Sequence, residues 1–161
     1  MNVLFVCTGN TCRSPMAEAL LKEKAPHINV QSAGIFAQPN DGANKHAIQT
    51  MKEKDIQLVH SAQSVTKKIL QWADLVLTMT TAHKTLLLNQ YPRYEQKYYT
   101  LKEYTATKGL GGDEVNIDKD IIDPFGGDLF LYKQTVIEIE KYIDVFIEKL
   151  DADAGGKKDE N

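Results

Sequence analysis

The sequence predicts an α/β domain in which a small parallel sheet carries helices on both faces. Short apolar runs alternate with longer segments of helical periodicity along the chain, and this alternation is typical of βα units. The 161 residues are 42% hydrophobic and 25% charged, an ordinary composition for one globular domain. We expect that domain to span residues 1–150 and to be followed by a polar, disordered tail over residues 151–161.

The elements can be placed in order along the chain from their apolar patterns. Strands are predicted where short apolar runs are bounded by polar or turn residues. Helices are predicted where apolar residues recur every three or four positions. The strands are expected at residues 2–6, 28–32, 74–79 and 98–101, and the helices at 14–25, 41–54, 65–71, 81–89 and 129–150.

The first helix has the clearest start signals. Ser14 is a good N-cap residue, Pro15 suits the first helical position, and Glu18 comes early enough to favour the helix dipole. We therefore expect this helix to begin at Ser14.

Glycine and proline mark the approach to the last helix. Residues 108–118 contain three glycines and predict a loop, and Asp-Pro-Phe-Gly-Gly over residues 123–127 predicts a turn. Asp128 is expected to cap the helix that follows. Its apolar seam favours packing on the sheet over a coiled coil, and consists of Leu129, Tyr132, Val136, Ile139, Ile143, Phe146 and Leu150.

Composition argues against several functional classes. The formal net charge of −3 favours neither a nucleic-acid nor a membrane partner, because both are usually met by a basic patch. No apolar run approaches the ~20 residues that span a bilayer, and the first residues lack the pattern of a secretion signal. Two cysteines, Cys7 and Cys12, are too few for a disulfide framework and have no metal-ligand spacing. A protein of the reducing cytoplasm without a metal is expected.

Residues 7–14 carry the chemistry. They follow a predicted strand and open a predicted helix, a context in which backbone N–H groups converge on an anion. Cys7 at the strand end should be held there as a nucleophilic thiolate. Arg13 supplies a planar fork for two oxygens of a tetrahedral oxyanion, and the Ser14 hydroxyl can donate to the sulfur. The predicted phosphate-binding loop comprises Thr8, Gly9, Asn10, Thr11, Cys12, Arg13 and Ser14.

The pattern Cys-x5-Arg-Ser at the N-terminus, with Asp123-Pro124 late in the chain, resembles the low-molecular-weight protein tyrosine phosphatases. The resemblance covers nearly the whole chain. It implies a four-stranded parallel sheet, no metal or organic cofactor, and phosphorylated protein substrates. It further implies that Cys7 attacks phosphorus to form a phosphocysteine, that Arg13 binds the phosphoryl oxygens, and that Asp123 acts as general acid and then as base. An isolated Asp123 would otherwise be a turn carboxylate before proline.

The same resemblance implies a supporting network around the loop. Asn10 would shape the loop, and Ser32 and His60 would fix Asn10 and Ser14. His60 is equally consistent with a purely structural histidine. His27, His46 and His83 belong to no motif and are expected to be surface or core histidines.

Two positions bear on the substrate. Tyrosine phosphatases of this family commonly carry isoleucine or leucine where this chain has Thr11, and aromatic residues directly after Asp-Pro, where it has Phe125 and then Gly126. Here the chain resembles the protein arginine phosphatases, a branch of the same fold. The Thr11 hydroxyl would face a polar guanidinium, so phosphoarginine is the favoured substrate, with phosphotyrosine as the alternative.

Other readings of the loop are weaker. A thioredoxin-coupled arsenate reductase needs further cysteines, and residues 13–161 contain none. A non-catalytic phosphate-binding module usually loses its nucleophile or its acid, whereas Cys7 and Asp123 are both present. Cys12 either packs in the loop or captures an oxidised Cys7 as a disulfide.

Overall fold

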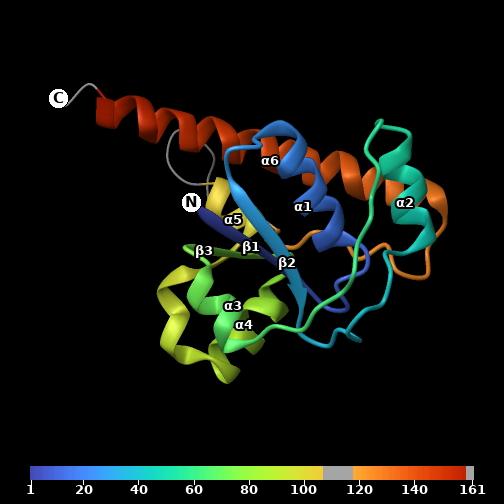
Figure 1. The fold of residues 1–161 in the computed structure, drawn as a ribbon, viewed down its shortest axis with the longest axis horizontal. Helices are drawn as coiled ribbons and strands as arrows, with labels where there is room; N and C mark the ends of the chain where they lie inside the picture. Colours follow the sequence, from blue (N-terminus) through green and yellow to red (C-terminus); the bar gives the residue numbers. More distant parts are fainter. Residues whose placement is uncertain (107–117, 159–161) are drawn as a thin grey trace.

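The computed structural model describes residues 1–106 and 118–158. Its sheet has four parallel strands in the order β2-β1-β3-β4, which confirms the predicted α/β fold (Figure 1). The strands are β1 (Asn2–Cys7), β2 (Asn29–Gly34), β3 (Leu75–Thr78) and β4 (Tyr98–Thr100). The helices are α1 (Arg13–Lys24), α2 (Lys45–Lys52), α3 (Lys67–Trp72), α4 (Thr81–Gln90), α5 (Leu101–Thr105) and α6 (Leu129–Lys158), with a 3-10 helix η1 (Pro92–Lys97).

Helices cover both faces of the sheet, because alternate residues of the central strand β1 point in opposite directions. Val3 and Phe5 join the larger apolar cluster, which includes residues of α1 and α6. Leu4 and Val6 join the smaller cluster, which includes residues of α3 and α4. In Figure 1, α1, α2 and α6 accordingly lie on one side of the sheet, and α3 and α4 on the other.

The register brings the carboxyl ends of β2, β1 and β3 to one edge of the sheet. Cys7 at the end of β1 pairs with Gly34 at the end of β2, and Val6 pairs with Thr78 at the end of β3. In parallel sheets ligands bind beyond this edge. The loop after β1 therefore occupies the place where this fold forms a site.

The apolar seam of the last helix packs in the larger apolar cluster from Tyr132 to Phe146, as predicted, but the helix ends later than predicted. Asp128 Oδ1 accepts the backbone N–H of Leu131 at 3.0 Å and caps α6 as expected. The helix then continues to Lys158, so the expected end at residue 150 is too early, and residues 151–158 are helical where a disordered tail was expected. Adding residues to an existing helix needs no new nucleation, so a polar stretch can continue it.

Other boundaries differ from the sequence prediction in smaller ways. The helix expected from residue 41 begins at Lys45, because Asn44 caps it by accepting the N–H of His46. α5 was not expected, and a capping box of Thr100 and Glu103 starts it directly after β4. The predicted loop at 108–118 and the end of the predicted tail fall largely outside the described residues.

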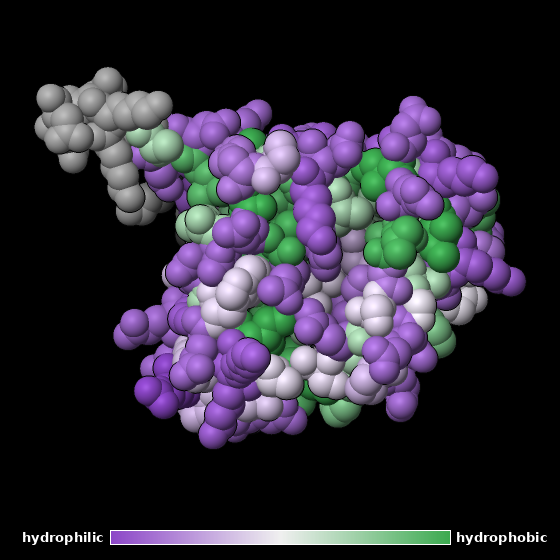
Figure 2. Space-filling view, viewed as in Figure 1, coloured by the Kyte–Doolittle hydropathy of each residue, from purple (hydrophilic) through white to green (hydrophobic). Residues whose placement is uncertain are grey.

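The surface in Figure 2 is mostly polar, with apolar side chains gathered around α2. Ile48 of α2 is one of the exposed apolar residues of the chain. Within residues 1–106 and 118–158, no helix has both the length and the apolar character needed to cross a membrane.

Candidate active site

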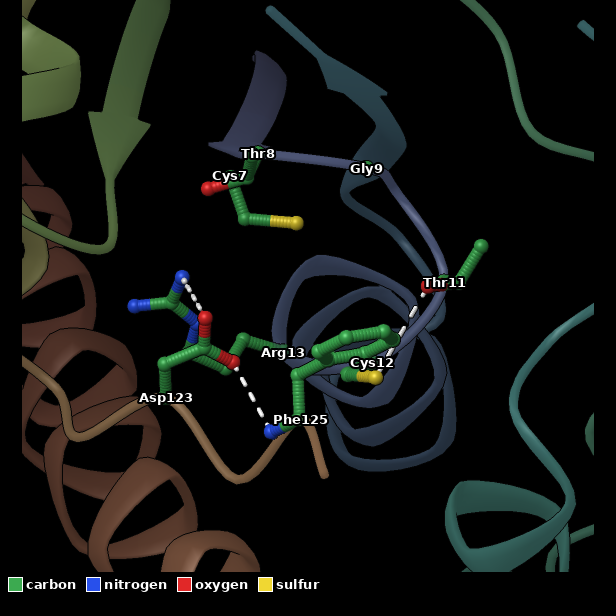
Figure 3. Close-up of a pocket in the computed structure, with 8 residues that line it drawn as sticks. All are labelled: Cys7, Thr8, Gly9, Thr11, Cys12, Arg13, Asp123 and Phe125. Atoms are coloured by element: carbon green, nitrogen blue, oxygen red, sulfur yellow. Dashed lines mark hydrogen bonds and ion pairs between the residues drawn. The ribbon is translucent and has the colours of Figure 1, made fainter. Parts of the chain in front are cut away.

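A pocket of about 210 Å³ opens at the carboxyl end of β1 (Figure 3). One wall comes from the loop between β1 and α1, and the other from the segment that precedes α6. The pocket is therefore built where two distant parts of the sequence meet. It is lined by Cys7, Thr8, Gly9, Thr11, Cys12, Arg13, Asp123 and Phe125.

Cys7 is the last residue of β1 and is almost fully buried, with its Sγ atom in the pocket. Ser14 Oγ lies 2.8 Å from this sulfur. Asn10 Nδ2 donates to the same Ser14 oxygen at 2.9 Å. Because an amide nitrogen can only donate, the Ser14 proton is left to point at the sulfur. The serine can thus stabilise negative charge on Cys7.

Ser14 is not the N-cap that the sequence predicted. α1 begins at Arg13, Cys12 occupies the cap position, and no side chain bonds the free N–H groups there. The hydroxyl that would have capped the helix is used on Cys7 and Asn10 instead. An apparent capping signal was therefore a signal of the site.

Asn10 holds the loop from its centre. Its backbone is left-handed, with φ 58°, and its side chain is fully buried. Nδ2 donates to Ser14 Oγ and Ser32 Oγ, both at 2.9 Å. Oδ1 accepts from the Gln63 N–H at 3.0 Å, and His60 Nε2 lies 2.8 Å from the Asn10 carbonyl. The structure thus brings together all the residues assigned to the supporting network.

Glu18 extends this network rather than serving the helix dipole. It lies beyond the first turn of α1, and Ser32 Oγ donates to its Oε1 at 2.6 Å. Its other oxygen pairs with Lys22. Ser32 accepts from Asn10 and donates to Glu18, so every proton in this chain of hydrogen bonds has a fixed direction.

Arg13 is buried and held on two sides. Nη1 donates to the Ile121 carbonyl at 2.9 Å, and Nη2 lies 3.5 Å from Asp123 Oδ2. The Arg13 side chain is 4% exposed, whereas that of Asp123 is 51% exposed. The guanidinium is therefore fixed at the pocket wall, and the carboxylate beside it remains open to substrate and water.

Asp123 and Phe125 face the loop from across the pocket. Asp123 Oδ1 accepts the Phe125 N–H at 3.0 Å, which stabilises the predicted turn. Asp123 thus serves both the turn and the site. The Phe125 ring is exposed and projects over the pocket mouth toward Thr11 and Cys12 (Figure 3).

Thr11 and Cys12 are neighbours in the loop with different surroundings. Thr11 lines the pocket, and its carbonyl accepts the N–H of Asn44. Cys12 is buried with its Sγ 3.2 Å from Tyr132 Oη, and burial raises the pKa of its thiol. Cys7 and Cys12 are both free thiols, so the redox role of Cys12 remains a prediction.

His83 is the site residue that the sequence prediction missed. Its Nε2 lies 2.8 Å from Thr8 Oγ1 in the loop, and its Nδ1 lies 3.0 Å from Thr80 Oγ1. Burial, with a smaller effect from Arg13, lowers the pKa of His83 to about 4. One signal was available: parallel topology places residues that follow β3 beside the loop that follows β1.

The arrangement suits phosphoryl transfer through sulfur. A buried cysteine with a hydroxyl donor, a fixed guanidinium and an open carboxylate converge on one small pocket. Among the described residues, no three His, Cys, Asp or Glu side chains cluster as a metal site. Cys7, Arg13 and Asp123 have the chemistry that could serve as a nucleophile, an oxyanion binder and a proton carrier, respectively.

Comparison with known proteins agrees with this geometry. A family model described as low molecular weight phosphotyrosine protein phosphatase matches residues 2–156. The chain is 45% identical over 157 residues to the protein-arginine-phosphatase of Bacillus subtilis (strain 168), covering 95% of this chain and 99% of the relative. It is 38% identical over 144 residues to the low molecular weight protein-tyrosine-phosphatase PtpB of Staphylococcus epidermidis, covering 89% of this chain and 95% of the relative.

A solved structure of the arginine phosphatase YwlE matches the fold with a TM-score of 0.84 at 44% identity, covering 94% of this chain and 96% of that one. That protein is a mutant in which a serine replaces a cysteine, and its active-site serine is phosphorylated. Family model, sequence relatives and fold all agree. The chain belongs to the low molecular weight phosphotyrosine protein phosphatase family.

Proposed function

We propose that this enzyme removes phosphate from phosphoarginine in proteins through a phosphocysteine at Cys7. The observation that carries the proposal is the hydrogen bond of 2.8 Å between Cys7 Sγ and Ser14 Oγ, at the floor of a pocket that also holds Arg13 and Asp123. The phosphorylated serine in the YwlE mutant supports a covalent intermediate at the position of the nucleophile.

In the first step, the Cys7 thiolate attacks phosphorus in line with the departing group. An S–P bond forms and the P–N bond to arginine breaks. Arg13 binds phosphoryl oxygens, where transition-state charge accumulates, and its anchoring by the Ile121 carbonyl keeps it in place. Asp123 in its acid form gives its proton to the leaving nitrogen.

In the second step, water attacks phosphorus and the S–P bond breaks. Asp123, now a carboxylate, takes a proton from that water. The electron pair returns to Cys7, and the Ser14 proton that points at the sulfur stabilises the returning thiolate. Inorganic phosphate then leaves and the site is restored.

Phosphoarginine suits the walls of this pocket. The Thr11 hydroxyl and the Asp123 carboxylate can both accept N–H donors from a guanidinium. The exposed Phe125 ring offers a face on which the guanidinium plane can stack. The 45% identity to a protein-arginine-phosphatase supports this choice.

Phosphotyrosine is the second candidate substrate. The Phe125 ring would pack equally well on a phenyl ring, and PtpB is a relative named as a tyrosine phosphatase. Against it, Thr11 places a hydroxyl where an aliphatic side chain would fit a phenyl ring better. We further propose the cytoplasm as the compartment, where both thiols would stay reduced.

Thr11→Ile tests the choice of substrate. The variant should shift the ratio of kcat/KM values for phosphoarginine and phosphotyrosine at least about 10-fold toward phosphotyrosine, since one polar contact is worth one to a few kcal/mol. Thr11→Val separates polarity from size, because it keeps the branched shape and replaces only the hydroxyl by a methyl group, and it should shift the ratio in the same direction. If Thr11→Ile leaves the ratio unchanged while both activities persist, Thr11 does not select the substrate.

A further inference from the structure

Thr8, His83 and Thr80 form a chain of hydrogen bonds that the two-step mechanism does not use. Thr8 follows the nucleophile and lines the pocket. Its Oγ1 lies 2.8 Å from His83 Nε2, and His83 Nδ1 lies 3.0 Å from Thr80 Oγ1. His83 itself is 5% exposed. These hydrogen bonds thus run from the start of α4, through a buried histidine, to the rim of the phosphate pocket.

The N-cap of α4 favours one direction for each of these hydrogen bonds. Thr80 Oγ1 accepts the backbone N–H of His83 at 3.1 Å. Its own proton can then be donated to His83 Nδ1, 3.0 Å away, and we assign it there, so that Nδ1 accepts and Nε2 carries the imidazole proton. Nε2–H therefore donates to Thr8 Oγ1. Neither His83 nor Thr80 then accepts the Thr8 proton, which can point into the pocket.

The surroundings keep His83 in this neutral form. Burial, with a smaller contribution from Arg13, lowers its pKa to about 4, although Asp123 and Asp120 oppose the shift. A neutral imidazole carries one proton only, which is the condition for the alternation of donor and acceptor described above. Its partners Thr80 and Thr8 are both uncharged.

We propose that His83 is a positioning residue that holds the Thr8 hydroxyl so that its proton is donated to the bound phosphoryl group. This inference rests on the proposed phosphatase function. The Thr8 oxygen accepts from His83, so its proton is available to an acceptor in the pocket. Of the two ends of a bound phosphoarginine, the phosphoryl oxygens can accept this proton and the guanidinium cannot. Thr8 thereby adds a side-chain donor to the phosphate-binding loop.

A purely structural His83 would explain the same burial, so the test must separate the two roles. The first measurement is the ¹⁵N chemical shift of the His83 ring in the whole protein, with and without inorganic phosphate. The proposal expects protonated Nε2 and unprotonated Nδ1 in both conditions. Protonated Nδ1 would overturn it. This measurement needs no variant and no turnover.

The second measurement is a double-mutant cycle on the competitive inhibition constant of inorganic phosphate and on kcat/KM. Thr8→Val should raise that constant about 10-fold or more, as expected for a lost hydrogen bond to a charged group, and Thr8→Ser should stay within about 3-fold. His83→Leu should resemble Thr8→Val, and His83→Gln, which retains a donor, should recover part of the loss. Thr105→Val, in α5, is the control for a buried threonine, whose hydroxyl donates to carbonyl oxygens of its own helix.

The combination of Thr8→Val with His83→Leu decides the mechanism. If His83 acts through Thr8, the double variant is no worse than Thr8→Val alone. Multiplied losses, or a phosphate affinity that His83→Leu leaves unchanged, overturn the proposal. If His83→Leu does not unfold cooperatively, the ring tautomer and the Thr8 variants decide in its place. If the wild-type protein hydrolyses neither phosphoarginine nor an aryl phosphate, that result refutes the proposed function rather than the role of His83.

Discussion

At the scale of single residues, the direction of the hydrogen bonds around Cys7 determines how its thiolate is stabilised. Asn10 donates to Ser14, and Ser14 is thereby left to donate to Cys7. A serine in this position helps little with attack on phosphorus, because the hydrogen bond stabilises the thiolate before the reaction as well. It matters more when the thiolate must leave in the second step.

Ser14→Ala should therefore slow the breakdown of the phosphocysteine more than its formation. We expect kcat to fall about 10-fold to 100-fold, the range for a lost hydrogen bond to a charged group. Rapid mixing with an aryl phosphate should show a burst of product that approaches one equivalent of enzyme. The exposed Ser61, whose hydroxyl donates to Asn40 away from the pocket, provides Ser61→Ala as control. Equal slowing of the burst and of the steady state would contradict the assigned role.

At the scale of elements, the loop needs close contact with the end of β2. A Cβ atom on Gly34 would lie 2.6 Å from the Thr8 carbonyl oxygen and 2.9 Å from the Asn10 backbone nitrogen. Both are backbone atoms of the loop, which cannot rotate away as a side chain can. Gly34 is thus the residue that lets the adjoining strand support the loop.

Gly34→Ala should displace the loop and lower both activity and stability. We expect kcat/KM to fall at least about 10-fold and the free energy of unfolding to fall by about 1–3 kcal/mol, the usual cost of an overpacked site. Gly42→Ala is the matched control, because a Cβ there meets nothing within 4 Å. Urea unfolding and steady-state kinetics measure the two effects. Wild-type activity in Gly34→Ala would show that the loop tolerates the displacement.

The elements also show which features can be read from sequence. The strands and the seam of α6 followed from apolar spacing, which burial imposes directly. Ser14 and Glu18 were predicted to serve the start of α1, but tertiary partners took both side chains. His83 lacked any local motif, because its partner Thr8 lies 75 positions away. Local rules fail at the site, where long-range contacts decide what a side chain does.

At the scale of the whole molecule, the buried His83 links folding to pH. Its pKa is about 4 in the folded protein and 6.5 is its ordinary value. Between these values the unfolded chain binds more protons than the folded one. The contribution of a neutral His83 to the free energy of unfolding is therefore fully present above pH 6.5 and is lost as the pH falls toward 4.

The expected loss from this histidine between pH 7 and pH 4.5 is about 2–3 kcal/mol. His83→Gln removes the titrating ring, so its free energy of unfolding should depend less on pH over this range. Urea unfolding at several pH values compares the two proteins, with His27→Gln at an exposed histidine as control. Identical pH dependence in wild type and His83→Gln would show that His83 binds its proton equally in both states.

During turnover, the Cys7 sulfur is proposed to carry the phosphoryl group. The direct measurement is to quench a reaction with a phosphoarginine protein during the first turnover and to locate the phosphate on the enzyme by mass spectrometry. We expect phosphate on Cys7 in the wild-type enzyme and no phosphate above background on the double variant that carries Cys7→Ala and Cys12→Ser, which has no thiol. Phosphate on another residue, or full turnover by Cys7→Ala, would contradict it.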